Sequence, residues 1–348
     1  MLKKLRVKDF TVFADATFDF GALNVIHGEN SSGKTHLLKL AYSVVSSLVP
    51  APNEPAGERP TKAGMDQRLG TKLVGVFRPD RGKVGRLARR VQGQKRAEVT
   101  ANFGGDGKLT IAFSTQSDRA VKTEVLPSAW LPQAPAFLST RELLSVYPGF
   151  VSLYETQAIP FDEVWRDTCV LLGAPIARGP KKKEISGLLE PLERAIGCRA
   201  ILEGDRFFVQ MTRPNAKVEA DLVAEGYRKL TMVARLIANG SLDDKGFLFW
   251  DEPEANLNPQ LIKRLAPLLL DLASGGVQVF VATHSLFLMR ELEIQQAKRR
   301  KRVNTRYFGL HQGPDGVDVE QGRTIDDSGD IVSLDESLDQ SDRFMALD

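Results

Sequence analysis

The residues with the clearest chemical potential are two adjacent carboxylates, Asp251 and Glu252, which directly follow the apolar run at residues 247–250. A continuous apolar run is typical of a strand buried on both faces, as the central strands of parallel sheets are. Open α/β sheets bind ligands in the crevice at the carboxyl ends of such strands. We therefore expect a ligand site here; the alternative is a buried strand followed by an acidic loop.

A second pattern lies near the N-terminus, where residues 28–35 read GENSSGKT and match G-x-x-x-x-G-K-[ST] in full. An apolar stretch at residues 22–27 precedes it, and the sequence after it has helical periodicity. Glycines let successive backbone N–H groups point at a phosphate, lysine supplies positive charge, and the threonine hydroxyl can ligate Mg²⁺. The alternative is a glycine-rich turn that binds nothing. The predicted nucleotide-binding residues are Gly28, Glu29, Asn30, Ser31, Ser32, Gly33, Lys34 and Thr35.

Two further groups stand where predicted elements begin or end. Gly226 follows Glu225 just inside the start of a predicted helix, where backbone N–H groups are open to an anion. A simple N-terminal turn is the alternative. His284 follows a second buried strand at residues 277–282, at its carboxyl end. A lone histidine is more often structural, but this position favours chemistry.

Four segments must position these residues. We expect residues 1–140 to form the N-terminal half of the fold, with an antiparallel β subdomain, the phosphate loop and a basic excursion at 50–96. Residues 141–197 are predicted to form an inserted helical lobe, because they show helical periodicity. Residues 198–312 complete the fold. Residues 313–348 are predicted to form a hairpin and an acidic tail that is poorly ordered or docks on a basic surface.

Composition limits the function classes. The chain has 348 residues, is 42% hydrophobic and carries a net charge of +3, which is typical of an ordinary globular protein. Two cysteines are too few for a disulfide framework or a cysteine-based metal site. Because no apolar run approaches 18 residues and no signal peptide is evident, we expect a cytoplasmic protein with no membrane contact of its own.

Residues 78–96 hold eight Lys or Arg against one acid, Asp80. Such a run could follow the phosphates of a nucleic acid. The alternative is a solvated surface, which we favour because residues 82–96 lack the aromatic side chains that single-strand binders usually interleave with their cations.

In order, the phosphate loop, the glycine-containing helix start, the DEPEANLNP stretch and the histidine resemble the ATP-binding-cassette (ABC) ATPases, and among them the soluble SMC-like, RecF-like and OLD-like proteins. The resemblance covers residues 1–48 and 220–312. It implies an α/β fold: an ABC-type P-loop ATPase head with a mixed or parallel sheet core, an N-terminal antiparallel β subdomain and an inserted helical lobe. Residues 50–220 show no sustained heptad pattern, which excludes the long coiled coil of SMC proteins.

The resemblance also implies roles for single residues. Asp251 and Thr35 would hold Mg²⁺, and Glu252 would be the base for the attacking water. His284 would read the γ-phosphate of ATP, beside Lys34. Phosphoryl transfer needs these parts: a metal and positive donors on the developing charge, and one group that orients water.

The chain departs from the family pattern at two places. The signature of the family contains a serine and two glycines and ends in glutamine, whereas residues 224–227 read AEGY; Glu225 and Gly226 are the matching nucleotide-binding positions. The glutamine that senses Mg²⁺ is not evident, and Glu142 stands at about its place. The turn containing Asn256 would cross to a second subunit.

The resemblance implies a homodimer that encloses ATP and Mg²⁺ between its subunits. The leading hypothesis is an ATPase whose dimerisation or conformational change regulates a separate effector, a nuclease or toxin, because DEPEANLNP resembles ATPases of bacterial anti-phage defence operons. A RecF-like DNA-repair ATPase is the main alternative. A transporter subunit and a non-hydrolysing ATP sensor are further alternatives; the degenerate signature counts against the first and the intact Glu252 against the second.

Overall fold

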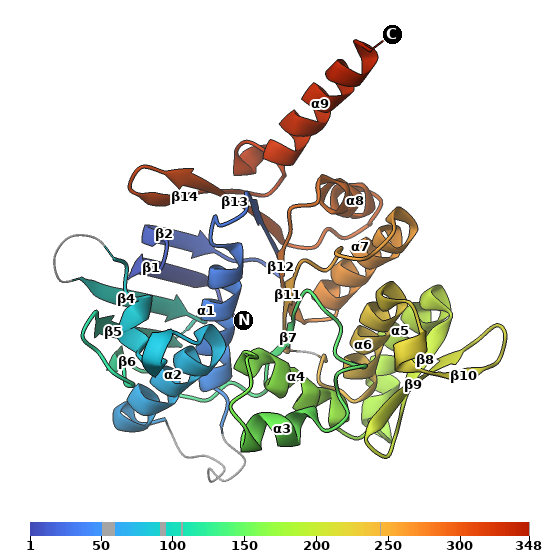
Figure 1. Cartoon of the computed structure of the whole chain (residues 1–348), viewed down its shortest axis with the longest axis horizontal. Helices are drawn as coiled ribbons and strands as arrows, with labels where there is room; N and C mark the ends of the chain where they lie inside the picture. Colours follow the sequence, from blue (N-terminus) through green and yellow to red (C-terminus); the bar gives the residue numbers. More distant parts are fainter. Residues whose placement is uncertain (51–59, 91–94, 106, 244, 348) are drawn as a thin grey trace.

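The structure, a computed structural model, describes residues 1–50, 60–90, 95–105, 107–243 and 245–347. Its centre is a six-stranded sheet in the order β14-β13-β3-β12-β11-β7 (Figure 1). All neighbours pair in parallel except β14, which is antiparallel to β13. The predicted mixed sheet with a parallel core is therefore confirmed. Its strands are β3 (Leu23–Gly28), β7 (Ala136–Leu138), β11 (Phe247–Asp251), β12 (Gln278–Ala282), β13 (Thr305–Gly313) and β14 (Gly316–Gly322).

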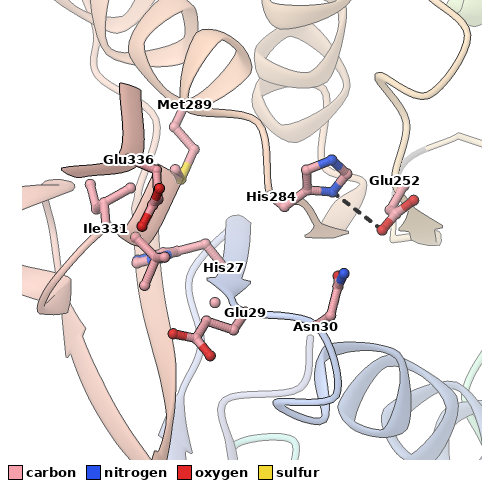
Figure 2. A pocket seen from close by; sticks show the side chains of 10 residues that line it. His27, Glu29, Asn30, Glu252, His284, Met289, Ile331 and Glu336 are labelled. Atoms are coloured by element: carbon pink, nitrogen blue, oxygen red, sulfur yellow. Dashed lines mark ion pairs between the residues drawn. The ribbon is translucent and has the colours of Figure 1, made fainter. Parts of the chain in front are cut away.

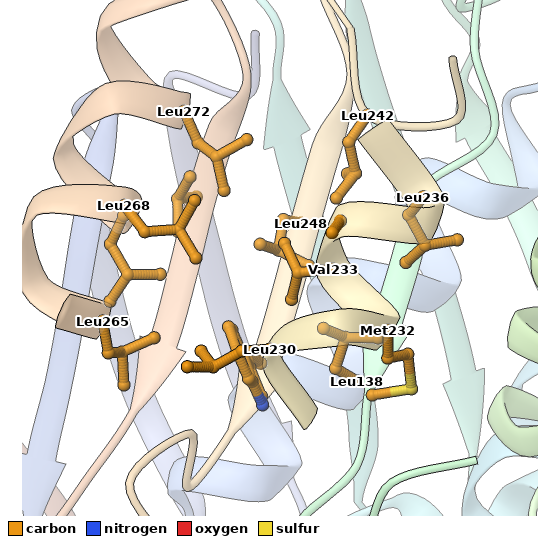
Figure 3. Packing of buried hydrophobic residues seen from close by; sticks show 14 of the residues in the cluster. Leu138, Leu230, Met232, Val233, Leu236, Leu242, Leu248, Leu265, Leu268 and Leu272 are labelled. Atoms are coloured by element: carbon orange, nitrogen blue, oxygen red, sulfur yellow. The ribbon is translucent and has the colours of Figure 1, made fainter. Parts of the chain in front are cut away.

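Both faces of the central sheet are covered, which explains why its strands read as unbroken apolar runs. Alternate residues of β11 enter two different cores: Leu248 and Trp250 face one, whereas Phe247 and Phe249 face the other. The first core contains helices α6 and α7, whose leucines pack on the sheet (Figure 3). The covering helices are α1 (Lys34–Ser47), α6 (Glu225–Ala238), α7 (Pro259–Ser274) and α8 (Leu286–Ala297).

The N-terminal antiparallel sheet that the sequence predicts is also confirmed. Its order is β2-β1-β4-β5-β6, and it shares the second core with helix α1. Helix α2 lies beside it, and two short 3₁₀ turns follow α2. These elements are β1 (Lys4–Phe10), β2 (Phe13–Asp19), β4 (Arg96–Asn102), β5 (Lys108–Ser114), β6 (Lys122–Val125), α2 (Lys62–Phe77), η1 (Asp80–Gly82) and η2 (Val84–Leu87).

Helices occupy the predicted lobe after residue 141. Their aromatic residues pack on one another, with the rings of Phe161 and Trp165 4.8 Å apart, so they stabilise the lobe from within. A small antiparallel sheet, β10-β9-β8, follows in the chain. Among the described residues the longest helix, α5, has 17 residues, and no coiled-coil arm is present. The elements are α3 (Phe150–Thr156), α4 (Glu163–Gly173), α5 (Pro180–Ile196), β8 (Cys198–Glu203), β9 (Arg206–Met211), β10 (Lys217–Glu219) and η3 (Ala220–Leu222).

The C-terminal tail differs from the expectation of a poorly ordered or docked segment. After the 3₁₀ turn η4 (Asp326–Ser328), residues Val332–Met345 form helix α9, which projects from the body (Figure 1). Phe344 and Met345 near its end are about 70% exposed, at 73% and 68%. In the part of the chain that the structure describes, no helix is both long and apolar enough to cross a membrane.

Candidate nucleotide site

The phosphate loop connects β3 to α1, as the sequence predicts. Gly28 and Gly33 both have positive φ, at 143° and 95°. A Cβ on Gly28 would lie 2.3 Å from the carbonyl oxygen of Leu310, and one on Gly33 would lie 2.6 Å from the Val12 side chain. Only glycine fits these two positions, because a side chain would be both strained and overlapping. The loop therefore turns tightly into the N-terminus of α1, where backbone N–H groups are free to meet an anion.

Lys34, the first residue of α1, reaches back over the loop. Its ammonium donates hydrogen bonds to the carbonyl oxygens of Gly28 and Glu29, at 2.8 and 2.7 Å. Burial lowers the pKa of Lys34, while the carboxylates of Glu252 and Asp251 act in the opposite direction. A negatively charged phosphate in the loop would give this partly desolvated cation a further, stronger partner.

Asp251 ends strand β11 and meets the phosphate loop directly. The Thr35 hydroxyl donates a hydrogen bond of 2.8 Å to Asp251 Oδ2, although the two residues are 216 positions apart in the chain. Burial raises the pKa of Asp251, and the bond from Thr35 opposes that shift. A hydroxyl and a carboxylate side by side are hard oxygen ligands, which Mg²⁺ prefers when phosphates supply the rest of its coordination. The donor set therefore fits Mg²⁺.

Glu252 and His284 come from neighbouring strand ends. The Glu252 N–H donates to the carbonyl oxygen of Ala282, at 2.8 Å, which ties the end of β11 to β12. Glu252 Oε1 then lies 3.3 Å from His284 Nδ1 (Figure 2). The side chain of Glu252 is 30% exposed and that of His284 is 59% exposed, so both remain accessible to a ligand.

Two cavities adjoin the phosphate loop. The first, of about 470 Å³, is lined by Gly28, Glu29 and Asn30 of the loop together with Glu252 and His284 (Figure 2). The base of α9 also borders it. The second, of about 610 Å³, is lined from the same loop and α1 by Ser31 and His36, together with apolar residues and arginines from other elements: Val12, Phe77, Arg86, Leu87, Arg89 and Val317. The loop thus has a carboxylate-and-histidine side and an apolar, basic side.

Glu225 and Gly226 begin helix α6, as predicted, but they do not line the first cavity. Gly226 lies against the turn that follows the carboxylates. A Cβ on Gly226 would meet the side chains of Leu257 and Leu261 at 2.9 Å and the carbonyl oxygen of Asn256 at 3.2 Å. Within one chain, Gly226 supports this turn, and neither Glu225 nor Gly226 lines the first cavity beside the phosphate loop.

Glu142, the predicted stand-in for the metal-sensing glutamine, is fully engaged elsewhere. Its carboxylate pairs with Arg228 at 2.9 Å and accepts hydrogen bonds from the N–H of Leu144, at 2.7 Å, and from the N–H and hydroxyl of Ser145. These contacts anchor the segment after β7 to helix α6. None of them involves Thr35 or Asp251, so the contacts of Glu142 give no support to a metal-binding role.

The basic run at residues 78–96 is largely paired with acids, within the part that the structure describes; residues 91–94 lie outside it. Examples are Arg86 with Asp80 at 2.9 Å and Arg96 with Glu124. Lys83 contacts Asp118, Lys95 contacts Asp9, and Arg89 donates to the carbonyl oxygen of Asp315. Cations that already have partners are less available to phosphates, which favours the solvated-surface interpretation.

Sequence reasoning missed two buried charges beside the site, Lys229 and Glu254. Lys229 is completely buried in α6, and Glu254 is 7% exposed in the turn after β11. A signal for Lys229 was available: Val233 and Leu236 follow it at helical spacing and are apolar, so Lys229 interrupts an apolar helix face. Glu254 gave no such signal, because acids in a turn are usually solvated.

Comparison with known proteins bears on the family and the fold of this chain. Residues 139–290 match the family described as "AAA domain, putative AbiEii toxin, Type IV TA system". No curated protein matches the chain. A crystal structure of an SmcHead bound to the C-winged helix domain of ScpA matches with a TM-score of 0.55 and 14% identity, covering 93% of this chain and 98% of that one.

A second crystal structure, of an Smc head domain with an extended coiled coil bound to the C-terminal domain of ScpA from Pyrococcus furiosus, matches with a TM-score of 0.52 and 12% identity, covering 99% of each chain. At such low identity these likenesses concern the fold. Together with the family match and the phosphate loop, they show that the chain has the fold of an SMC- and RecF-like, ABC-type P-loop ATPase head.

Proposed function

We propose that this chain binds ATP with Mg²⁺ and hydrolyses it. The observation that carries the proposal is the hydrogen bond between Thr35 and Asp251, because it joins the phosphate loop to the carboxylate strand and leaves Glu252 and His284 at the same sheet edge. The ATPase-head fold supports ATP binding. Turnover is expected to be slow, as suits a regulatory ATPase.

Each residue of the site has a role in this proposal. Thr35 and Asp251 would hold Mg²⁺, which neutralises charge on the β- and γ-phosphates when bound. Lys34 and the loop N–H groups would donate to the same phosphates. Glu252 would orient the attacking water and accept its proton, and His284, which lies beside Glu252, would donate to the γ-phosphate.

The two cavities divide the nucleotide between them. Glu252 and His284 line the first cavity, which therefore suits the γ-phosphate and the attacking water. His36 and Phe77 line the second, whose apolar walls suit the base and the ribose. The phosphate loop lies between them and would hold the β-phosphate.

The proposal extends to a homodimer and an effector. Because the start of α6 lies outside the cavity of its own chain, Glu225, Gly226 and the Asn256 turn would meet the ATP of a second subunit. ATP-dependent closure would then regulate a separate effector, proposed to be a nuclease or toxin of a bacterial anti-phage system. The toxin–antitoxin wording of the family description supports a toxin-like context. The solved SMC heads bind ScpA domains, which supports a protein partner on this fold.

The substitution Glu252→Gln tests hydrolysis. It keeps the size of the side chain and one acceptor oxygen but removes the base, so turnover should fall roughly a hundredfold or more, in line with general-base contributions. ATP binding should persist, as measured by titration with a fluorescent ATP analogue. Glu203→Gln, on the exposed β8–β9 hairpin, is the matched control and should leave turnover unchanged. Equal turnover in the Glu252→Gln and wild-type proteins would remove Glu252 from the mechanism.

A further inference from the structure

The turn between Glu252 and Leu257 carries the proposed base and has a strained backbone. Glu252 has φ of 47° and Asn256 has φ of 63°, and neither is glycine. Residues in this region of conformational space persist only where the surroundings impose it, and they cluster at functional sites. The residues packed around this turn must therefore hold Glu252 in its strained conformation.

Lys229 holds the turn from the side of helix α6. Its side chain is completely buried, and its ammonium donates a hydrogen bond of 2.5 Å to the carbonyl oxygen of Ala255, in the middle of the turn. Burial lowers the pKa of Lys229, while the acids around it, Glu225 first and then Glu254 and Glu252, act in the opposite direction. A lysine buried this deeply is costly unless its charge is used.

Glu254 holds the turn from the side of the histidine. Its Oε1 accepts the hydroxyl proton of Thr283, and the Thr283 oxygen in turn accepts the N–H of Ser285, at 2.9 Å. The same Oε1 lies 4.0 Å from His284 Nδ1, so the carboxylate fixes both residues that flank the histidine and lies close to the histidine itself. The other oxygen, Oε2, is buried without a hydrogen-bond partner among the described residues.

We propose that Lys229 and Glu254 are positioning residues for hydrolysis. Together they fix the strained turn to helix α6 on one side and to residues 283–285 on the other, so that Glu252 and His284 keep their relative position. The inference rests on the proposed ATPase function and deepens it. Neither residue touches the cavity that would receive the γ-phosphate. Both act through other residues: Lys229 through the backbone at Ala255, and Glu254 through Thr283.

The proposal predicts a link between the start of α6 and the base. Gly226 packs against the same turn, so a second subunit that displaces α6 would move Ala255 through Lys229. A purely structural role for the two charges would instead lower stability and leave the chemistry of the folded enzyme unchanged. Measuring kcat of variants that are shown to be folded distinguishes the two roles: a positioning role lowers kcat, whereas a purely structural role does not.

The test uses four variants of the full chain: Thr283→Val, Glu254→Met, Glu254→Gln and Lys229→Met. Thr283→Val and Glu254→Met break the same hydrogen bond, so each should lower kcat about tenfold to a hundredfold, as misplacement of catalytic groups by up to about 1 Å does, with ATP affinity unchanged. Glu254→Gln keeps an acceptor oxygen for Thr283 and should restore most of that loss. The Thr283→Val/Glu254→Met double variant should lose no more than either single variant.

Lys229→Met should lower kcat in the same way. Thr168→Val is the matched control for Thr283→Val. Thr168, like Thr283, is completely buried, and its hydroxyl donates a hydrogen bond to the carbonyl oxygen of Phe137, away from the turn. Unchanged kcat in folded Thr283→Val would overturn the inference. Additive losses in the Thr283→Val/Glu254→Met double variant would overturn it as well. If Lys229→Met does not fold, Thr283→Val still provides the test. A wild-type protein without turnover would overturn the proposed function, and this inference with it.

Discussion

At the residue scale, the site depends on a few side chains that burial has moved away from their solution behaviour. Lys34 and Asp251 are both desolvated, and burial shifts each pKa toward the neutral form: downward for the lysine and upward for the aspartate. Nearby opposite charges and the Thr35 hydroxyl oppose these shifts. A nucleotide with Mg²⁺ would supply the missing countercharges, so the unliganded site is electrostatically prepared for its proposed ligands.

His27 gives a prediction about pH at the same scale. It directly precedes the phosphate loop, is 2% exposed and bonds Ser328 through Nε2, at 2.7 Å. Burial, with smaller effects from His311 and Lys34, lowers the pKa of His27 to about 4. The unfolded chain binds a proton below about pH 6.5 and the folded chain does not until about pH 4. The unfolding free energy should therefore fall as pH drops from 6.5 to 4.

Urea unfolding at pH 7 and pH 5 checks this expectation. The contribution of His27 to the loss between these two values is about 2 kcal/mol, from 1.36 kcal/mol per pKa unit. His27→Gln lacks this titrating group, and all other titrating groups are shared with the wild type. The loss of unfolding free energy between pH 7 and pH 5 should therefore be smaller in His27→Gln by about 2 kcal/mol. Equal pH dependence in both proteins would contradict the burial of a neutral His27.

At the element scale, the start of α6 and the turn after β11 are packed so closely that they behave as one unit. Gly226, at the start of α6, is buried against the turn, and Lys229 joins the helix to the turn by a hydrogen bond. The sequence identifies both elements from apolar periodicity and from the strand-end carboxylates. It could not show that they are in contact, because Gly226 and Asp251 are 25 positions apart, with most of α6 and of β11 between them.

Replacement of Gly226 by alanine tests this packing. The added Cβ would lie 2.9 Å from terminal methyl groups of Leu257 and Leu261 and 3.2 Å from the carbonyl oxygen of Asn256, so these side chains or the turn must shift, and overpacking of this kind costs about 1–3 kcal/mol of unfolding free energy. Gly187→Ala is a matched control, because Gly187 also lies within a helix and its Cβ would meet nothing within 4 Å. That variant should be stabilised by up to about 1 kcal/mol. Equal stability of the two variants in urea would contradict the close packing.

At the scale of the whole molecule, the proposed catalytic residues Glu252 and His284 lie at an edge of the central sheet where their side chains remain partly exposed. The first cavity is lined by Glu252 and His284, while Gly226 lies outside it; in the proposed dimer, one chain would therefore cover only part of the nucleotide. A second copy, turned so that its α6 start meets the γ-phosphate, would complete the enclosure. The base of α9 borders the same cavity through Ile331, Val332 and Glu336, so the acidic tail stands at the edge where that copy would dock.

Light scattering after gel filtration tests the dimer. Glu252→Gln should bind ATP without hydrolysing it, so the protein should shift from monomer to dimer mass when ATP and Mg²⁺ are added. Adding Lys34→Ala to that variant removes a phosphate ligand and should keep the protein monomeric. A monomer at every ATP concentration, with ATP binding intact, would contradict the enclosed-nucleotide dimer and leave the hydrolysis proposal standing.

Local patterns determined much of this molecule. The phosphate loop could be predicted because two glycines with positive φ, a lysine and a threonine must stand at fixed spacing to bind a phosphate. The buried strands could be predicted because β11 and β12 have no polar face. The helix in the tail could not, since the acidic sequence has few apolar residues to commit it to one structure.

Only the tertiary structure decided which distant residues meet. Thr35 and Asp251 are separated by 216 positions, and their contact follows from the order of β3, β12 and β11 in the sheet, which no local pattern specifies. Burial likewise depends on packing. Burial distinguishes Glu254, enclosed beside Thr283, from the exposed acids of the tail. The tertiary contacts also show that Glu142 and most described cations of the basic run already have partners.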